Sequence, residues 1–152
     1  MDVRIIVGLF ALTLVKATPL TLGALSGIFC ERSGVVNIAI EGMMLTAAFA
    51  GFAAAYYSGS SLVGILVALL TGALLALLHA TLSIRFEMDQ IISGTVINLM
   101  AVGVTGYFNR VLFASRTVPG VRTLPMIDIP LLSEIPYLGT ILFSHQPIVF
   151  AS

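Results

Sequence analysis

Three long apolar runs constrain this chain more than any other feature of its sequence. They cover residues 38–57, 62–84 and 91–111, and a helix needs about 20 mostly apolar residues to cross a bilayer. Only 9% of the 152 residues are charged and 59% are hydrophobic, whereas a soluble domain carries about 25% charged residues. Short polar linkers between the runs make neighbouring helices antiparallel. The sequence therefore predicts an all-α fold, a polytopic membrane helix bundle.

The same composition excludes several classes of function. Seven basic residues balance seven acidic ones, so no basic field is present to hold a phosphate backbone, and no nucleic-acid partner is expected. Cys30 is the single cysteine, which rules out an intrachain disulfide and a thiolate metal cluster. The sequence contains no G-x-x-x-x-G-K-S/T phosphate loop and no H-E-x-x-H or G-x-S-x-G motif. We therefore expect no catalytic residues, no metal site and no cofactor.

The first thirty residues are less regular than the runs that follow. Residues 5–30 are mostly apolar, but Lys16 and Pro19 interrupt them, and neither half alone reaches across a bilayer. We predict a helix that is interrupted at 16–19. A polar break then follows, which contains Glu31, Arg32, Ser33 and Gly34. Because non-helical backbone at membrane depth is tolerated only inside protein or beside a water-filled cavity, we expect other helices or water around this break.

Residues 112–146 differ from the spans in composition. Prolines punctuate or close this stretch at positions 119, 125, 130, 136 and 147, and we predict an extramembrane loop with short surface helices. A new apolar run starts at 147–152 and reaches the last residue. Because so short a run cannot span a bilayer, it predicts the start of a further helix. The chain is then the N-terminal part of a longer protein.

One acidic residue stands out near the start of the run 38–57. Glu41 lies one turn inside this span, where a carboxylate in lipid costs about 2.5–3.5 kcal/mol or more, so it should face protein or water. Asn37 is a candidate N-cap, and an acidic residue in the first turn gains from the positive helix end. Two interpretations stay open. Glu41 braces the helix start against a neighbouring helix, or it lines a translocation path.

The run 91–111 carries a polar face. Steps of three or four place polar and small residues on one side of the helix, namely Gln90, Gly94, Asn98, Ala101, Thr105 and Asn109. Asn98 lies in mid-span and needs a hydrogen-bonding partner or water. An amide hydrogen bond between helices is the commoner explanation, and a wetted path is the functional one. The candidate residues of that path are Asn37, Glu41, Gln90, Asn98 and Thr105.

The run 62–84 carries a stripe of small residues at every fourth position. Its members are Gly64, Ala68, Gly72, Ala76 and Ala80. Such stripes let a second helix backbone approach closely in a membrane, so we predict tight helix packing there and no chemistry. His79 lies on nearly the same side, and a histidine that is hydrogen-bonded inside the bundle is favoured over a proton relay.

Residues 31–44 read E-R-S-G-V-V-N-I-A-I-E-G-M-M and resemble the N-terminal signature of a permease family. The family comprises membrane subunits of ABC importers for branched-chain amino acids, ribose-type sugars and nucleosides. The nucleoside or simple-sugar branch is the most similar. Residues 89–94 with Asn98, and the proline-containing stretch 112–144, are similar as well, so the resemblance covers nearly the whole chain. It implies a multi-pass protein of a bacterial inner or cell membrane, with a translocation path for nucleosides or simple sugars.

The resemblance also implies partners and an orientation. The partners are a cytosolic ATPase subunit, a second permease subunit (like or unlike), an extracytoplasmic substrate-binding protein and the lipid bilayer. The hairpin at 85–90 would be cytosolic and the loop 112–146 outside. Arginines favour the opposite orientation, because Arg110, Arg116 and Arg122 lie at or in the loop whereas the hairpin holds Arg85 alone. We adopt the orientation implied by the longer signature.

Two other interpretations belong to different classes. A self-contained small helical membrane protein would oligomerise through the stripe of 64–80 and act as a scaffold or facilitator, without ATP. An intramembrane enzyme would use Glu41 and His79, and it ranks third because neither histidine of the chain has a plausible catalytic neighbour in the sequence.

Overall fold

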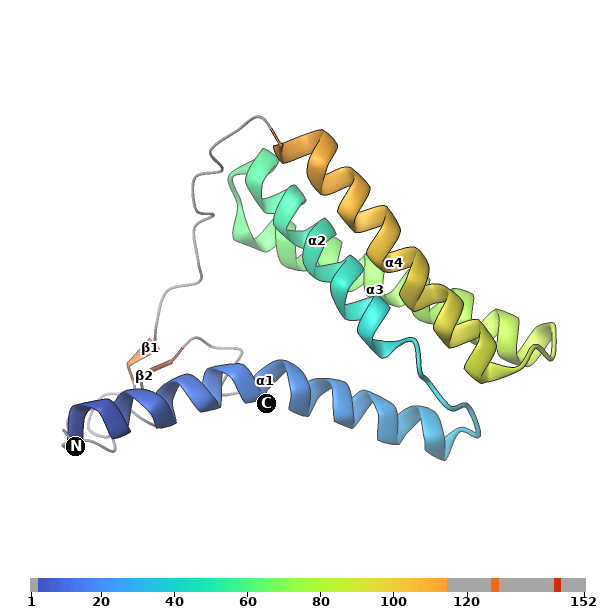
Figure 1. Ribbon diagram of the computed structural model, residues 1–152, viewed down its shortest axis with the longest axis horizontal. Helices are drawn as coiled ribbons and strands as arrows, with labels where there is room; N and C mark the ends of the chain where they lie inside the picture. The colour runs from blue at the N-terminus through green and yellow to red at the C-terminus, as the bar shows by residue number, and fades with distance from the viewer. Residues whose placement is uncertain (1–2, 115–126, 129–143, 146–152) are drawn as a thin grey trace. The chain divides into compact units, whose positions relative to one another are not determined.

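The helices of this chain account for most of its described residues. The structure is a computed structural model, which describes residues 3–114, 127–128 and 144–145. Its elements are α1 (Val3–Arg32), α2 (Ile40–Ser58), α3 (Ser61–Ala80), the π-helical turn η1 (Thr81–Arg85), α4 (Gln90–Phe113), β1 (Ile127–Asp128) and β2 (Ser144–His145) (Figure 1). The predicted helical membrane fold is confirmed, and the long helices lie close to the expected spans.

Helix α1 differs from the predicted interruption at 16–19. It is continuous over 30 residues with Pro19 inside it, which makes it about 45 Å long at 1.5 Å per residue. Pro19 removes one backbone donor, and membrane helices tolerate this loss. Next to the proline, the hydroxyls of Thr18 and Thr21 donate to the carbonyls of Leu14 and Thr18, at 3.1 and 2.8 Å. The proline therefore lies within one helix and does not divide it.

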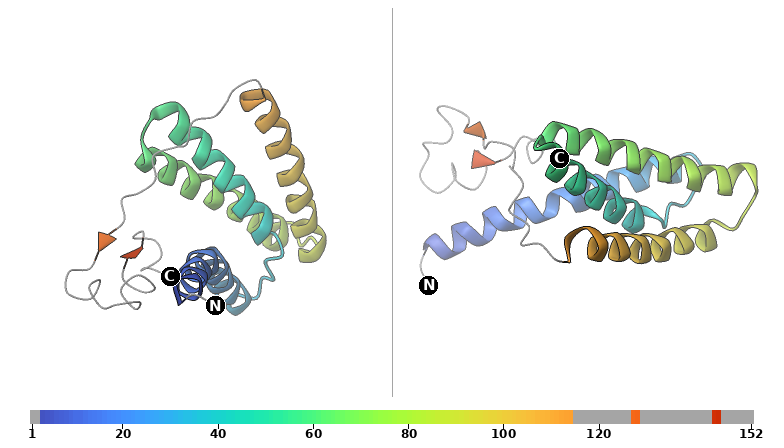
Figure 2. Two further views of the ribbon diagram at one scale, coloured as in Figure 1. Left: turned by 60° about the vertical axis from the view of Figure 1, so that its left-hand side comes forward. Right: turned by 90° about the horizontal axis from the view of Figure 1, so that it is seen from above.

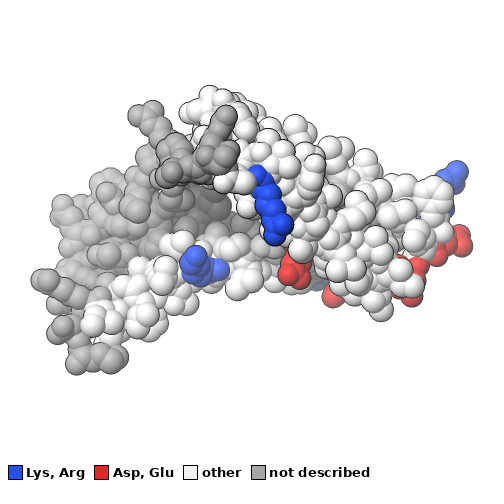
Figure 3. All heavy atoms as spheres, turned by 45° about the horizontal axis from the view of Figure 1, so that its top comes forward, with Lys and Arg blue, Asp and Glu red and all other residues white. Residues whose placement is uncertain are grey.

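Three of the described helical segments are long and apolar enough to cross a membrane, namely Gly8–Arg32, Ser61–Arg85 and Gln90–Phe113. Helix α2 is not among them, because a glutamate, many small residues and two tyrosines reduce its apolar character. Its role as a fourth span stays a prediction. On the face drawn in Figure 3, the described residues show few charged side chains, several of which gather at one end, and most of the remaining described surface is uncharged. Such a surface fits a chain that is largely surrounded by lipid.

The chain divides into two compact units, Met1–Ser26 with Leu124–Ser152, and Gly27–Thr123. In the second unit, α2 packs along both α3 and α4 (Figure 2). A tight turn at Gly59, whose φ of 69° favours glycine, reverses the chain between α2 and α3. The buried centre of the unit consists of Ala39, Met43 and Ile97, which come from α4 and from the start of α2.

Small residues set the distance between α2 and α3. A Cβ atom added at Gly64 would lie 2.7 Å from Cβ of Ala55 and 2.8 Å from the carbonyl oxygen of Gly51. One added at Gly51 would lie 2.9 Å from Cβ of Ala68 and from the carbonyl oxygen of Gly64. Two helix backbones approach this closely only where both carry small residues. The stripe on α3 therefore meets a helix of its own chain here.

The loop predicted at 112–146 is described only in part. Helix α4 continues to Phe113, and β1 and β2 form an antiparallel ladder that pairs Ile127 with His145 and Asp128 with Ser144. The described part of the stretch thus contains two short strands where surface helices were expected. The other residues of the loop, and the helix start predicted at 147–152, lie outside the described residues.

Candidate functional site

The break between α1 and α2 begins with an ordered helix end. The Gly34 N–H donates to the Glu31 carbonyl at 3.0 Å, and the Val35 N–H donates to the Cys30 carbonyl at 3.1 Å. With the φ of 83° at Gly34, these bonds form a Schellman C-cap, in which glycine is favoured at the left-handed position. Val35 is buried directly after it. Gly34 therefore turns the chain out of α1.

Asn37 shapes the start of α2 but is not its N-cap. Ala39 occupies the N-cap position and α2 begins at Ile40. The Asn37 Oδ1 accepts from the Ala39 N–H at 3.1 Å, which is an Asx turn before the helix. The Asn37 Nδ2 lies 3.8 Å from Cys30 Sγ and 3.7 Å from Met43 Sδ. The predicted cap is therefore wrong, because the amide binds the turn that leads into the helix.

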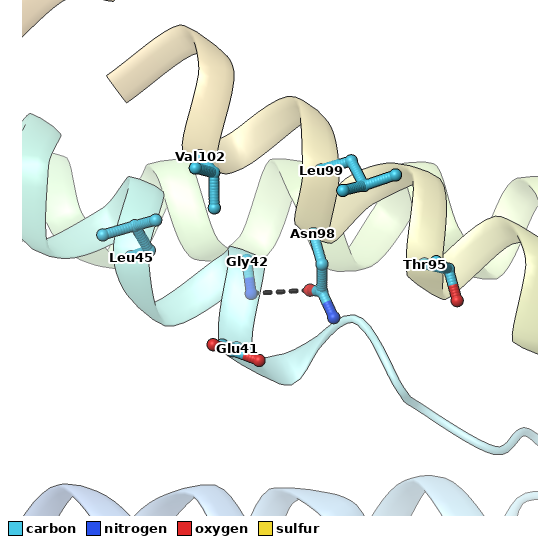
Figure 4. A pocket seen from close by; sticks show the side chains of 7 residues that line it. All are labelled: Glu41, Gly42, Leu45, Thr95, Asn98, Leu99 and Val102. Carbon is cyan, nitrogen blue, oxygen red and sulfur yellow. Dashed lines mark hydrogen bonds between the residues drawn. The ribbon is translucent and has the colours of Figure 1, made fainter. Parts of the chain in front are cut away.

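Asn98 of α4 binds the start of α2 with both ends of its amide. Its Oδ1 accepts from the Gly42 N–H at 2.7 Å (Figure 4). Its Nδ2 donates to the Ile38 carbonyl at 3.0 Å. The first N–H groups of a helix have no partner within the helix, so Asn98 satisfies one of these donors. A Cβ atom at Gly42 would lie 2.7 Å from the Asn98 Oδ1. The absence of a side chain at Gly42 lets the amide reach this backbone.

Gln90 and His79 hold the middle of the break. The Gln90 Oε1 accepts from the Val36 N–H at 2.6 Å, and its Nε2 donates to the Gly34 carbonyl at 3.4 Å. His79 is 2% exposed, with Nε2 3.4 Å from the Val36 carbonyl and Nδ1 3.1 Å from Ser93 Oγ. Because a carbonyl only accepts, the ring donates from Nε2, and Nδ1 has the Ser93 hydroxyl as its partner. The prediction of a histidine hydrogen-bonded inside the bundle is confirmed.

Helix α4 also touches the break through a glycine. A Cβ atom at Gly94 would lie 3.0 Å from Cβ of Ile38 and 3.1 Å from the Ala39 nitrogen. The N-terminus of α4 is fixed in turn by Asp89, whose carboxylate accepts from the N–H groups of Ile91 and Ile92 at 2.8 and 3.2 Å. The stretch 89–94 therefore caps α4 and brings it against the break.

The other predicted residues take little part in these contacts. The side chains of Glu31, Arg32 and Ser33 are exposed, and Glu31 contributes only its backbone carbonyl to the C-cap. Thr105 is buried, and its hydroxyl donates to the carbonyl of Ala101 at 2.6 Å, inside its own helix. In the stripe on α3, Ala76 is exposed.

Sequence analysis overlooked Gly42 and Ser93 as parts of the site. Gly42 belongs to the same 31–44 block as Glu41, and Ser93 lies within the similar 89–94 stretch. Both stretches resemble the permease family, so the sequence does carry a signal at these two positions. A serine or glycine in a membrane helix does not by itself show which backbone it meets.

A hollow of about 220 Å³ lies between the start of α2 and α4, and we call it the α2–α4 hollow. Its lining residues are Glu41, Gly42, Leu45, Thr95, Asn98, Leu99 and Val102 (Figure 4). Two predicted path residues, Glu41 and Asn98, thus line one space, whereas the other three do not. Within the described residues, no basic side chain pairs with the Glu41 carboxylate, which is exposed.

Comparisons with known proteins agree with the pattern in the 31–44 block. Residues 9–133 match a family model described as branched-chain amino acid transport system / permease component. The chain is 40% identical over 139 residues to a guanosine ABC transporter permease protein of Bacillus subtilis, with 87% of this chain and 44% of that protein covered.

Two further relatives are similar over comparable lengths. A nucleoside ABC transporter permease protein of Lactococcus lactis is 34% identical (87% and 44% covered), and a provisionally named glucose ABC transporter permease protein of Haloferax volcanii is 33% identical (90% and 41% covered). The chain thus spans less than half the length of these relatives. No solved structure matches it.

Proposed function

Because this chain belongs to the family of permease components of branched-chain amino acid transport systems, we propose that it forms part of the translocation pathway of an ATP-driven importer. The solutes of this importer are nucleosides or simple sugars. The observation that carries the proposal is the similarity of 87% of the chain to permeases named for guanosine and for nucleosides.

The break between α1 and α2 supports a pathway in this part of the chain. In transporters, interrupted helices place helix ends and free backbone groups near the substrate. Here the backbone of the break is held by Gln90, Asn98 and His79, so we assign these residues to the support of the break. Glu41 and Asn98 line the α2–α4 hollow and are our candidates for contact with solute. Asn37 and Thr105 are assigned to local structure.

The proposal includes the partners of an importer in a cell membrane. A cytosolic ATPase subunit drives the change of conformation, a second permease subunit completes the pore, and an extracytoplasmic binding protein delivers the solute. The permease itself carries out no catalysis, in keeping with a family of membrane components.

Affinity purification of the intact gene product tests this function. We expect an ATPase subunit to be recovered with it, and we expect membrane vesicles that contain both to accumulate a nucleoside or sugar only when ATP is supplied. Uptake that persists without ATP, by a protein that never recovers an ATPase, would support the self-contained facilitator instead. That alternative has lost its main support, because Gly64 and Ala68 of the stripe already meet α2 within the chain.

The orientation of the hairpin between α2 and α3 gives a second test. We propose that the turn at Ser60 faces the outside and that the hairpin at 85–90 faces the cytosol. A Ser60→Cys variant in a Cys30→Ser background should react with a membrane-impermeant thiol reagent added to intact cells. A matched Glu87→Cys variant should react only after the cells are opened. The reverse pattern would overturn the orientation and would agree with the arginine count.

A further inference from the structure

We propose that the α2–α4 hollow binds a sugar ring through a vicinal pair of hydroxyl groups, with the Glu41 carboxylate as their main acceptor. This inference rests on the proposed transport function and names the chemistry of the solute at one place on its path. It assigns to Glu41 direct contact with solute, where the sequence left a bracing role and a path role open.

The polar groups of the hollow are mostly acceptors. A carboxylate only accepts hydrogen bonds. Among the described residues, no basic side chain forms an ion pair with the Glu41 carboxylate. The Thr95 hydroxyl already donates to the Ile91 carbonyl at 2.8 Å, which leaves its oxygen to accept. The Asn98 amide binds backbone at the start of α2 through its oxygen and one N–H, and its second N–H can still donate. A solute that fits these groups must supply donors to Glu41 and Thr95 and can offer an acceptor to Asn98, and hydroxyl groups do both.

The remaining lining residues fit an uncharged ring. Leu45, Leu99 and Val102 provide apolar walls next to the polar end (Figure 4), as a sugar ring with C–H groups on its faces requires. The volume of about 220 Å³ is below the roughly 300–1,000 Å³ of pockets that enclose a whole drug-sized ligand. The hollow therefore has room for one ring of a nucleoside rather than for the whole molecule.

A cation fits the hollow less well than a sugar. Calcium takes 6–8 oxygen ligands, usually including more than one carboxylate. Glu41 is the single acidic residue in the lining, and no group of three metal-binding side chains is found among the residues that were described. The vicinal diol is also the chemistry that the ribose of a nucleoside shares with a free sugar, so either source of the ring satisfies the site.

The test uses the complete transporter with its ATPase and binding protein, and it compares guanosine with 2′,3′-dideoxyguanosine, which lacks the hydroxyl pair. A hydrogen bond to a charged group contributes about a tenfold preference or more, so we expect wild-type transporter to prefer guanosine by about 10- to 100-fold. Glu41→Gln keeps the shape but replaces one acceptor by a donor, and should reduce this ratio to about threefold or less. The control Glu87→Gln makes the same charge change outside the hollow and should leave the ratio unchanged.

A second measurement does not depend on the binding protein. A Thr95→Cys variant in a Cys30→Ser background is labelled with a thiol reagent in membrane vesicles. Millimolar guanosine should slow the labelling and dideoxyguanosine should not, and protection by D-ribose alone would identify the free sugar as sufficient. The inference would be overturned if Glu41→Gln reduced the uptake of guanosine and of dideoxyguanosine by the same factor. It would also be overturned if no solute with a vicinal diol slowed the labelling at position 95. Either result would leave Glu41 as a brace. ATP-independent uptake by the wild-type protein, or none at all, would instead contradict the proposed function.

Discussion

Replacing Asn98 by leucine should destabilise this protein more than any other single change that we consider. Leucine has nearly the shape of asparagine but offers no hydrogen bonds, so the Gly42 N–H and the Ile38 carbonyl both lose their partner. The bond to the Gly42 N–H is partly buried and the bond to the Ile38 carbonyl is exposed. Loss of the first partner costs about 1–3 kcal/mol, and loss of the second adds less. The measurement is the free energy of unfolding of the complete protein in detergent.

The matched control for this change is Asn109→Leu. Asn109 lies on the same helix, and its side chain is exposed. It should change the free energy of unfolding by about 0.5 kcal/mol or less, as is usual for surface substitutions. Equal stabilities for the two variants would show that the start of α2 does not depend on Asn98. The break would then be held by Gln90 and His79 alone.

Replacing Gly64 by alanine should force α2 and α3 apart. The added Cβ would lie 2.7 Å from Cβ of Ala55 and 2.8 Å from the Gly51 carbonyl oxygen. Both atoms are fixed to a helix backbone, so no side chain can rotate out of the way. Overpacking of this kind costs about 1–3 kcal/mol, and we expect a corresponding decrease in the free energy of unfolding in detergent.

Gly72→Ala provides the control, because it makes the same change in the same stripe two turns further along. Its added Cβ would have Ala47 Cβ as its nearest neighbour, at 3.9 Å, which is an ordinary contact. Alanine gains up to about 1 kcal/mol over glycine in helix propensity at both positions, so the comparison removes this effect. A Gly64 variant as stable as the Gly72 variant would mean that the closest α2–α3 contact is looser than the structure shows.

The residues of the polar face on α4 were largely predictable from the sequence, but the groups that they bind were not. The spacing of Gln90, Gly94 and Asn98 identified one side of the helix, and the amide hydrogen bond between helices was the commoner of two interpretations. The partners are backbone groups that lie 54 to 60 residues away in the sequence. No local pattern states which backbone a mid-span amide will meet. The face therefore supports the break at least as much as it can line a path.

Two predictions near the start of the chain were wrong for physical reasons that sequence patterns do not contain. The interruption at 16–19 was inferred from Pro19, yet one missing donor does not end a helix that is apolar on both sides. Asn37 was expected to be the N-cap of α2 because asparagine is one of the residues most often found at N-cap positions. The Schellman turn at Gly34 and the Asx turn at Asn37 instead move the helix start to Ile40.

The sequence by itself determined that the chain is a set of membrane helices, where most of them lie and that a polar break separates the first two. Those properties depend on local hydropathy, helix length and the conformational preferences of glycine, which neighbouring residues decide. The tertiary structure decided which groups satisfy the backbone of the break and which glycines allow close contact. It also decided that Glu41, Thr95 and Asn98 surround one hollow. Such contacts depend on how α2, α3 and α4 pack, because in an apolar medium a polar group that its own helix does not satisfy needs a partner on another segment.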